Sequence, residues 1–293
     1  MENRKEVRAG EGTLLLEETG DGLQLCGVKG NIKKLVVPDM VEGLAVTSVG
    51  KKALLSNKEV TEVSLPDTLK EIGDWAFAHC SSLKRVRLPD QRLQIGKGIF
   101  KDCGQLALVD TGKDEDTARL LAAALVLFGA EYLFDLKEAG SREWLEKWDS
   151  RMDSFLLQKD EAGFTKMILC GEEDLLADLP EYIAERRRAK ARVCFLRLLY
   201  PRGLSEERGK FLKEYLGSHA KGCESEAAWE VVLREHGDER SYYEMLTECG
   251  GVHAQNLPDM LQDMKEGHTE MKAYLMRCTK DTKEDDFFSA LLL

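Results

Sequence analysis

The chain has little proline and no long apolar run, and both absences narrow what it can be. Only 6 of its 293 residues are proline, and 43% are apolar, which argues against disorder. No segment approaches the roughly 20 apolar residues of a membrane-spanning helix. Near the N-terminus only residues 14–16 form an apolar run, whereas a secretory signal needs about 7 to 15 such residues. We therefore expect a folded cytoplasmic protein that does not bind membranes.

An excess of positive charge is also missing. The net charge is -11, and residues 1–112 are neutral, with 16 Lys and Arg against 16 Asp and Glu. Residues 113–293 hold the excess, with 26 basic residues against 37 acidic ones. Nucleic-acid binding rewards clustered positive charge, so we expect no nucleic-acid partner.

Motifs that mark an active site are absent from the sequence. The five histidines show no HExxH, and there is no GxxxxGK[ST], no GxGxxG after a strand and no GxSxG. The eight cysteines form no CxxC pair, which favours reduced, mostly buried thiols, although the even count leaves disulfides open. We predict no catalytic, cofactor-binding or metal-binding residues, and no cofactor.

A spacing of 23 residues relates three successive segments at six positions. The matching positions are Val49, Ile72 and Ile95; Gly50, Gly73 and Gly96; Leu54, Phe77 and Phe100; Asn57, Cys80 and Cys103; Val60, Leu83 and Leu106; and Val63, Val86 and Val109. One turn of this length cannot bury its own apolar stripe, but turns stacked about 4.8 Å apart pair their strands and share a core. The repeat therefore predicts a solenoid.

Each unit carries the strand pattern L-x-x-V-x-L-P, as in residues 83–89 and 60–66, and the first copy is residues 32–38. Residues 72–89, which read Ile-Gly-Asp-Trp-Ala-Phe-Ala-His-Cys-Ser-Ser-Leu-Lys-Arg-Val-Arg-Leu-Pro, resemble the BspA-like leucine-rich repeats. The resemblance covers about residues 13–112. It implies a leucine-rich-repeat solenoid and recognition of a partner, and many members of that family are surface-exposed or secreted.

The segment before the repeats predicts a hairpin. Residues 13–17 and 23–28 are joined across Gly20, Asp21 and Gly22, which favours a tight turn between two strands. We expect this hairpin to cover the first open edge of the solenoid, which would otherwise invite aggregation.

From Asp114 the apolar period becomes helical, which predicts eight or nine helices in residues 113–293. Helix-start signals lie at Asp114, Ser141, Asp160, Pro180, Ser205, Ser225, Ser241 and Asn256. Residues 117–128 are apolar on every side and predict a buried helix that caps the last repeat. The fold class is thus α+β: a solenoid with a hairpin cap over residues 1–112, then an all-helical domain that is an irregular bundle or a set of helical-repeat pairs.

The strand pattern also predicts which side chains a partner would meet. In L-x-x-V-x-L the x positions face outward, and the basic row at residues 84–87 is the centre of the predicted surface. A second basic segment, residues 186–192, is either the solvated face of a helix neutralised by Glu172, Glu173, Asp174 and Asp178, or a site for a partner or a phosphate. The candidate partner-binding residues are Glu62, Trp75, Lys84, Arg85, Arg87, Arg186, Arg187 and Lys190.

These patterns favour a non-catalytic protein-protein interaction or scaffold module that uses the leucine-rich-repeat surface, with another protein as its partner. The alternative is an enzyme or an exported effector whose activity lies in the helical domain. The apolar tail, residues 285–293, either docks on the chain's own helices or serves as a short motif for another protein.

Overall fold

The computed structural model of the chain describes residues 4–164 and 178–278. The chain divides into two compact units, Met1–Met152 and Asp153–Leu293, and each is described by itself. Among the described residues, no helix is both long and apolar enough to cross a membrane. Residues 172–174 and the tail at 285–293, on which two of our expectations rest, lie outside the described part of the chain.

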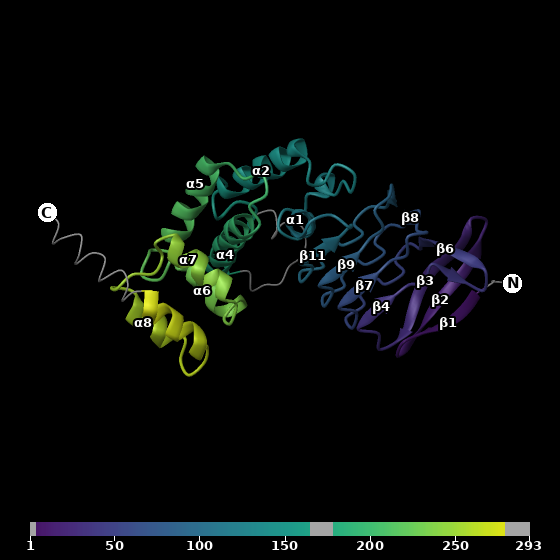
Figure 1. Cartoon of the computed structure of the whole chain (residues 1–293), viewed down its shortest axis with the longest axis horizontal. Helices are drawn as coiled ribbons and strands as arrows, with labels where there is room; N and C mark the ends of the chain where they lie inside the picture. Colours follow the sequence, from purple (N-terminus) through teal and green to yellow (C-terminus); the bar gives the residue numbers. More distant parts are fainter. Residues whose placement is uncertain (1–3, 165–177, 279–293) are drawn as a thin grey trace. The chain divides into compact units, whose positions relative to one another are not determined.

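A four-stranded parallel sheet runs along one side of the solenoid. Its strands are β4 (Lys34–Val36), β7 (Glu62–Ser64), β9 (Arg85–Arg87) and β11 (Leu108–Asp110), one from each turn, in the order β11-β9-β7-β4. Figure 1 shows these strands side by side in chain order. Each strand comes from the predicted L-x-x-V-x-L pattern, so the solenoid of about four turns with a 23-residue period is confirmed.

A second sheet runs along the other side of the turns. The parallel strands β6 (Leu44–Val49), β8 (Glu71–Ile72) and β10 (Gln94–Ile95) lie next to one another in this sheet. The short strand β5 (Met40–Val41) pairs antiparallel with β6. The strand β10 is one of the two edges of the sheet.

The predicted hairpin is confirmed, and it is part of a three-stranded antiparallel meander. The strands β2 (Gly12–Thr19) and β3 (Gly22–Gly30) pair antiparallel, and β3 then pairs with the first solenoid strand of its sheet, β6. The meander therefore covers the first edge of this sheet, as expected, whereas β4 is still an edge of the four-stranded sheet. The outer strand β1 (Arg4–Ala9) pairs with β2. The sequence does not predict this strand, because its mostly polar residues give no apolar alternation to detect.

Matching residues of successive turns stack into columns in the core. The central residues of the four-stranded sheet, Leu35, Val63, Val86 and Val109, are at most 2% exposed. In the next column the rings of Phe77 and Phe100 lie 5.4 Å apart. Burying each such side chain contributes roughly 1.5–3 kcal/mol, so the stacked columns stabilise the solenoid.

The helix α1 (Glu115–Val126) closes the last turn. Its N-cap Asp114 accepts the N–H of Thr117, as predicted. The helix contacts β11 and is buried along most of its length, so the predicted capping helix is present. Figure 1 shows it beside the last strand.

The next helix, α2 (Arg142–Leu156), begins in the same compact unit. The indole N–H of Trp148 donates to the carbonyl of Leu120 at 2.9 Å, and the Trp148 ring lies 5.1 Å from that of Phe128. Because of these contacts the first unit extends to Met152. The predicted division at residue 112 instead coincides with the change from strands to helices.

In the second unit, α4 (Leu179–Leu199) contacts three other helices. These are α5 (Glu206–Gly217), α6 (Ala227–Glu235) and α7 (Arg240–Glu248), and α8 (Leu257–Asp263) follows them. Because α4 packs against several neighbours, charged residues of its basic segment and last turn are buried: Arg188 is 9%, Lys190 5% and Arg197 0% exposed.

Most of the described helices begin within two residues of the signals that predicted their starts. Ser205 caps α5 by accepting the N–H of Arg208, and Ser141 accepts the N–H of Trp144 at 3.2 Å. The helices α6 and α7 begin one or two residues from the signals at Ser225 and Ser241. At these two ends a glutamate takes the N-cap position without a side-chain bond, which a search for Ser, Asp or Asn does not detect.

Candidate functional site

The outer face of the four-stranded sheet is the candidate site. In each strand the central residue is buried and its neighbours point outward, since side chains alternate between the two faces of a sheet. The outward positions are exposed or half-buried: Lys33, Lys34, Val36, Thr61, Glu62, Ser64, Lys84, Arg85, Arg87, Ala107, Leu108 and Asp110. The strand pattern therefore predicted the orientation of this face correctly.

Charged side chains pair across this face. Lys34 Nζ lies 3.0 Å from a carboxylate oxygen of Glu62, and Glu62 is the register partner of Arg85 in the next strand. Arg85 Nη2 donates to Asp110 Oδ2 at 3.1 Å. The N–H of Gly112, together with Arg85, holds the pKa of Asp110 below its ordinary value. Exposed pairs of this kind contribute little to stability, so their main effect is to orient the side chains.

The basic row at the centre of the face is only partly neutralised. Arg87 Nη2 donates to Asp67 Oδ1 at 3.1 Å, and its Nη1 donates to the carbonyl of Leu65 at 3.3 Å. Lys84 is exposed and has no ion pair within residues 4–164 and 178–278. Across the whole face, five basic residues point outward against two acidic ones, so this surface is positive on a chain whose net charge is -11.

A shallow pocket of about 480 Å³ lies where the strands of this sheet end. Arg87, Gln91 and Thr111 are among its lining residues. Thr111 is 1% exposed, and its hydroxyl has no hydrogen-bond partner among the residues that the structure describes. The pocket thus adds a guanidinium and an unused hydroxyl to one end of the basic row.

Trp75 lies outside the four-stranded sheet, in the turn that follows β8. Its side chain is exposed by 45%, and its backbone φ of 57° is in the left-handed region. Lys52 Nζ lies 5.2 Å from the centre of the indole. Lys52, Trp75 and Gly98 occupy the same place in successive turns, and all three have positive φ. The structure therefore does not bring Trp75 together with the basic row.

The candidate residues of the helical unit have partners within that unit. Lys190 Nζ and Arg187 Nε lie 2.7 Å and 2.8 Å from the carboxylate oxygens of Asp160. Arg186 hydrogen-bonds to Gln158, and its guanidinium lies 4.4 Å from the ring centre of Phe155. These contacts were missed because the partners lie 27 to 32 residues away in sequence.

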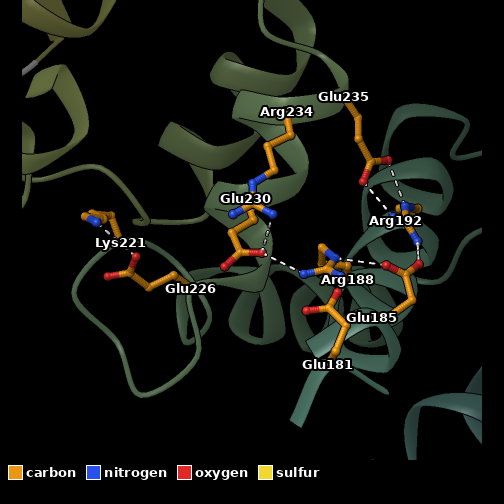
Figure 2. Close-up of polar contacts among 9 residues, drawn as sticks. All are labelled: Glu181, Glu185, Arg188, Arg192, Lys221, Glu226, Glu230, Arg234 and Glu235. Carbon is orange, nitrogen blue, oxygen red and sulfur yellow. Dashed lines mark hydrogen bonds and ion pairs between the residues drawn. The ribbon is translucent and has the colours of Figure 1, made fainter. Parts of the chain in front are cut away.

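The middle of the basic segment forms a cluster of ion pairs, shown in Figure 2. Arg188 contacts the carboxylates of Glu181, Glu185 and Glu230 at 2.6 to 3.0 Å. Arg192 contacts those of Glu185 and Glu235 at 2.6 and 2.7 Å.

The acidic partners in this cluster belong to α4 and α6. Arg188 and Lys190 are only 9% and 5% exposed, so the predicted solvated face is wrong for these two residues. Burial alone would raise the pKa of Glu185, but hydrogen bonds from Arg192 and Arg188 hold it below its ordinary value. This part of α4 therefore stabilises the helical unit. Among the described residues, no group of three or more His, Cys, Asp or Glu side chains is placed to hold a metal ion.

Comparison with known proteins identifies the repeats. Residues 29–117 match the family described as the BspA type leucine rich repeat region, in 6 copies. Residues 29–117 are BspA-type leucine-rich repeats. The matched residues contain all four strands of the four-stranded sheet, so the candidate face is built from BspA-type repeats. No curated protein sequence matches the chain.

Solved structures of leucine-rich-repeat proteins match about a third of the chain. A leucine rich cell surface protein from Faecalibacterium prausnitzii is 28% identical over 35% of this chain and 29% of its own, with a TM-score of 0.29. A leucine-rich repeat protein from Bacteroides capillosus is 30% identical over 34% of this chain and 78% of its own, with a TM-score of 0.31. This chain thus spans less than a third of the Faecalibacterium protein.

Proposed function

We propose that this chain is a non-catalytic protein-binding module whose partner, another protein, docks on the outer face of the four-stranded sheet. Leucine-rich-repeat arrays present extended surfaces that commonly bind proteins. The observation that carries the proposal is the row of exposed side chains on a rigid frame, since the residue between them in each strand is at most 2% exposed. Stacked strands hold such side chains at intervals of about 4.8 Å.

The charge of the face supports a partner with an acidic surface. Among the residues that the structure describes, Arg85 and Arg87 each have one carboxylate partner, and Lys84 adds a positive charge beside them. Complementary charge raises the rate of encounter and suppresses wrong partners. The exposed side chain of Val36, at 63%, supplies an apolar contact at the other end of the face.

A pair of charge reversals tests this function. We expect Arg85→Glu combined with Arg87→Glu to abolish capture of the partner from a lysate of the source cells, as followed by mass spectrometry. The matched control is Lys58→Glu with Lys70→Glu, which changes the net charge equally at two exposed lysines outside the four strands. Unchanged capture of every protein by the Arg85 and Arg87 variant would rule this face out.

We also propose that the protein works in the cytoplasm. The free thiols of Cys80, Cys103 and Cys194, which are at most 2% exposed, support a reducing compartment. Fractionation of the source cells tests this location, and recovery of the chain at the cell surface would contradict it.

A further inference from the structure

Successive turns of the solenoid are joined by backbone hydrogen bonds, and the last turn has donors for such bonds that no described residue accepts. Within the solenoid, three alternate N–H groups of one turn donate to carbonyls of the next: Trp75 to Lys97 at 2.9 Å, Phe77 to Ile99 at 3.0 Å and His79 to Lys101 at 2.8 Å. The preceding turn makes the same three bonds from the matching positions. The position of each N–H group in the repeat therefore determines where it points.

In the last turn the matching N–H groups belong to Gly98, Phe100 and Asp102. Gly98 donates to Glu131 Oε1 at 3.1 Å. Within the described part of the chain, the N–H groups of Phe100 and Asp102 have no acceptor. Phe100 is only 4% exposed, and a buried N–H group without a partner is rare in folded proteins.

A groove of about 650 Å³ lies along this unused edge. One side is the last turn itself, residues 95–104, and the other is formed by Leu125, Val126, Gly129, Glu131 and Phe134. Phe134 already packs on Phe100, with ring centres 5.9 Å apart. Glu131 and Phe134 thus occupy part of the space that a further turn would fill. The rest of that space is the groove.

The charges at the rim of the groove alternate from turn to turn. Lys51 Nζ lies 4.0 Å from Asp74 Oδ2, and Lys97 has the same place one turn later. The Lys97 side chain is exposed and has no ion pair within residues 4–164 and 178–278. Asp102 follows Lys97 by five residues, and its carboxylate lies 3.4 Å from Nδ1 of His79 in the turn before. The open side of the rim therefore presents a positive and then a negative charge.

We propose that this groove binds an extended segment of a partner protein, which adds to the open edge of the solenoid as a further rung in parallel register. Alternate carbonyls of the segment accept the N–H groups of Phe100 and Asp102, as in other cases of strand addition. The segment carries an acidic residue beside Lys97 and a basic residue five positions later, beside Asp102. Opposite Phe100 it carries a small residue, because Phe134 fills the interior there. The site is separate from the face of the four-stranded sheet.

The chain's own third turn provides the probe, because the carbonyls of Asp74, Ala76 and Ala78 accept the three matching N–H groups of the turn before it. The probe is a synthetic peptide of residues 70–80 with Phe77→Ala, His79→Lys and Cys80→Ser. Bound to the full chain, this peptide should slow amide hydrogen exchange at Phe100 and Asp102 at least about tenfold. Exchange at Lys101 is the internal control, because its N–H already donates to the Gly98 carbonyl at 3.1 Å.

A charge swap tests the register. Lys97→Glu should weaken binding of the peptide about tenfold, equivalent to roughly 1.4 kcal/mol, and should favour a second peptide that also carries Asp74→Lys. Lys97→Gln removes the charge without reversing it, so it should weaken the first peptide less than Lys97→Glu does and should relieve the repulsion of the second peptide. The control Lys84→Glu, on the four-stranded sheet, should leave both affinities unchanged, so this test is independent of the proposed function.

Three outcomes would overturn the proposal. The first is exchange at Phe100 and Asp102 that saturating peptide does not slow, and the second is an affinity that Lys97→Glu does not change. The third is self-association of the full chain, measured by sedimentation, that Lys97→Glu abolishes. That result would assign the groove to a second copy of the chain.

Discussion

Lys190 Nζ lies 2.7 Å from the carboxylate of Asp160, and Lys190 is itself 5% exposed. Arg187 Nε donates to the same carboxylate at 2.8 Å. Asp160 thus neutralises two cations of the basic segment on α4. An ammonium that is buried without its counter-ion destabilises the folded state, so this carboxylate is a sensitive point of the helical unit.

We expect Asp160→Asn to lower the free energy of unfolding of the helical unit by about 1–3 kcal/mol, because a buried charged donor loses its acceptor. Urea denaturation at neutral pH, followed by circular dichroism, measures the change. The control is Glu244→Gln, which breaks an exposed pair with Arg240 and should have almost no effect. Equal effects of the two substitutions would contradict the importance of Asp160.

The same carboxylate should make the helical unit sensitive to acid. Burial alone would raise the pKa of Asp160, but hydrogen bonds from Arg187 and Lys190 hold it below its ordinary value. A carboxyl group whose pKa is lowered by folding stabilises the folded state at pH values above its unfolded pKa of about 4. This contribution is lost as the pH falls through the folded pKa. We therefore expect stability to fall below about pH 4, and to fall less in Asp160→Asn. Melting curves between neutral and acidic pH test this, and identical slopes for the two proteins would contradict it.

Gly98 should be sensitive to substitution for two reasons. Its φ is 60°, and a Cβ at this position would lie 2.7 Å from Cδ1 of Trp75. We expect Gly98→Ala to destabilise the solenoid by roughly 1–2 kcal/mol from its backbone conformation alone, and to alter the fluorescence of the displaced indole. Gly104→Ala is the control, since its Cβ would meet nothing within 4 Å and its φ is not positive. Similar melting temperatures for the two variants would argue against this environment of Gly98.

Shortened chains should differ in solubility according to how much of the cap they keep. A chain ending at residue 112 lacks α1 and should be insoluble or poorly ordered, because the end of such an array needs a cap. One ending at residue 132 should behave better, and one ending at residue 152 should unfold cooperatively because it keeps Trp148, which packs on Phe128. Soluble yield and urea unfolding measure this series. If the shortest chain is soluble and melts as sharply as the full chain, the capping role of α1 is wrong.

Thiol labelling of the native protein should discriminate between its cysteines. Cys80 and Cys103 are 1% and 2% exposed and donate to carbonyls of the preceding turn at 3.1 and 3.0 Å. Burial raises the pKa of Cys194, which further slows its reaction because the thiolate is the nucleophile. We expect these three to react only on unfolding, and the half-buried Cys223 to react before them. Rapid modification of Cys80 and Cys103, read by mass spectrometry, would contradict their place in the core.

The solenoid could be predicted because each turn repeats the same physical requirement. Val63, Val86 and Val109 recur at one spacing since each fills the same place in the core, and the outward side chains follow from strand geometry. The partner of Lys190 could not be predicted in this way. Its distance in sequence from Asp160 reflects how α4 packs, and no local period records that. Trp75 was predicted as a partner-binding residue, but the sequence does not reveal that it lies outside the four-stranded sheet.

The backbone ladder between turns also determines how such a protein can change over evolutionary time. Two successive turns donate N–H groups to the next from the same three positions, so a duplicated turn would find compatible neighbours on both sides. In-frame duplication or loss of one whole repeat could therefore lengthen or shorten the exposed face while the cap stays unchanged. An insertion of one residue within a turn would instead shift its donors out of line with both neighbours, and selection should remove it.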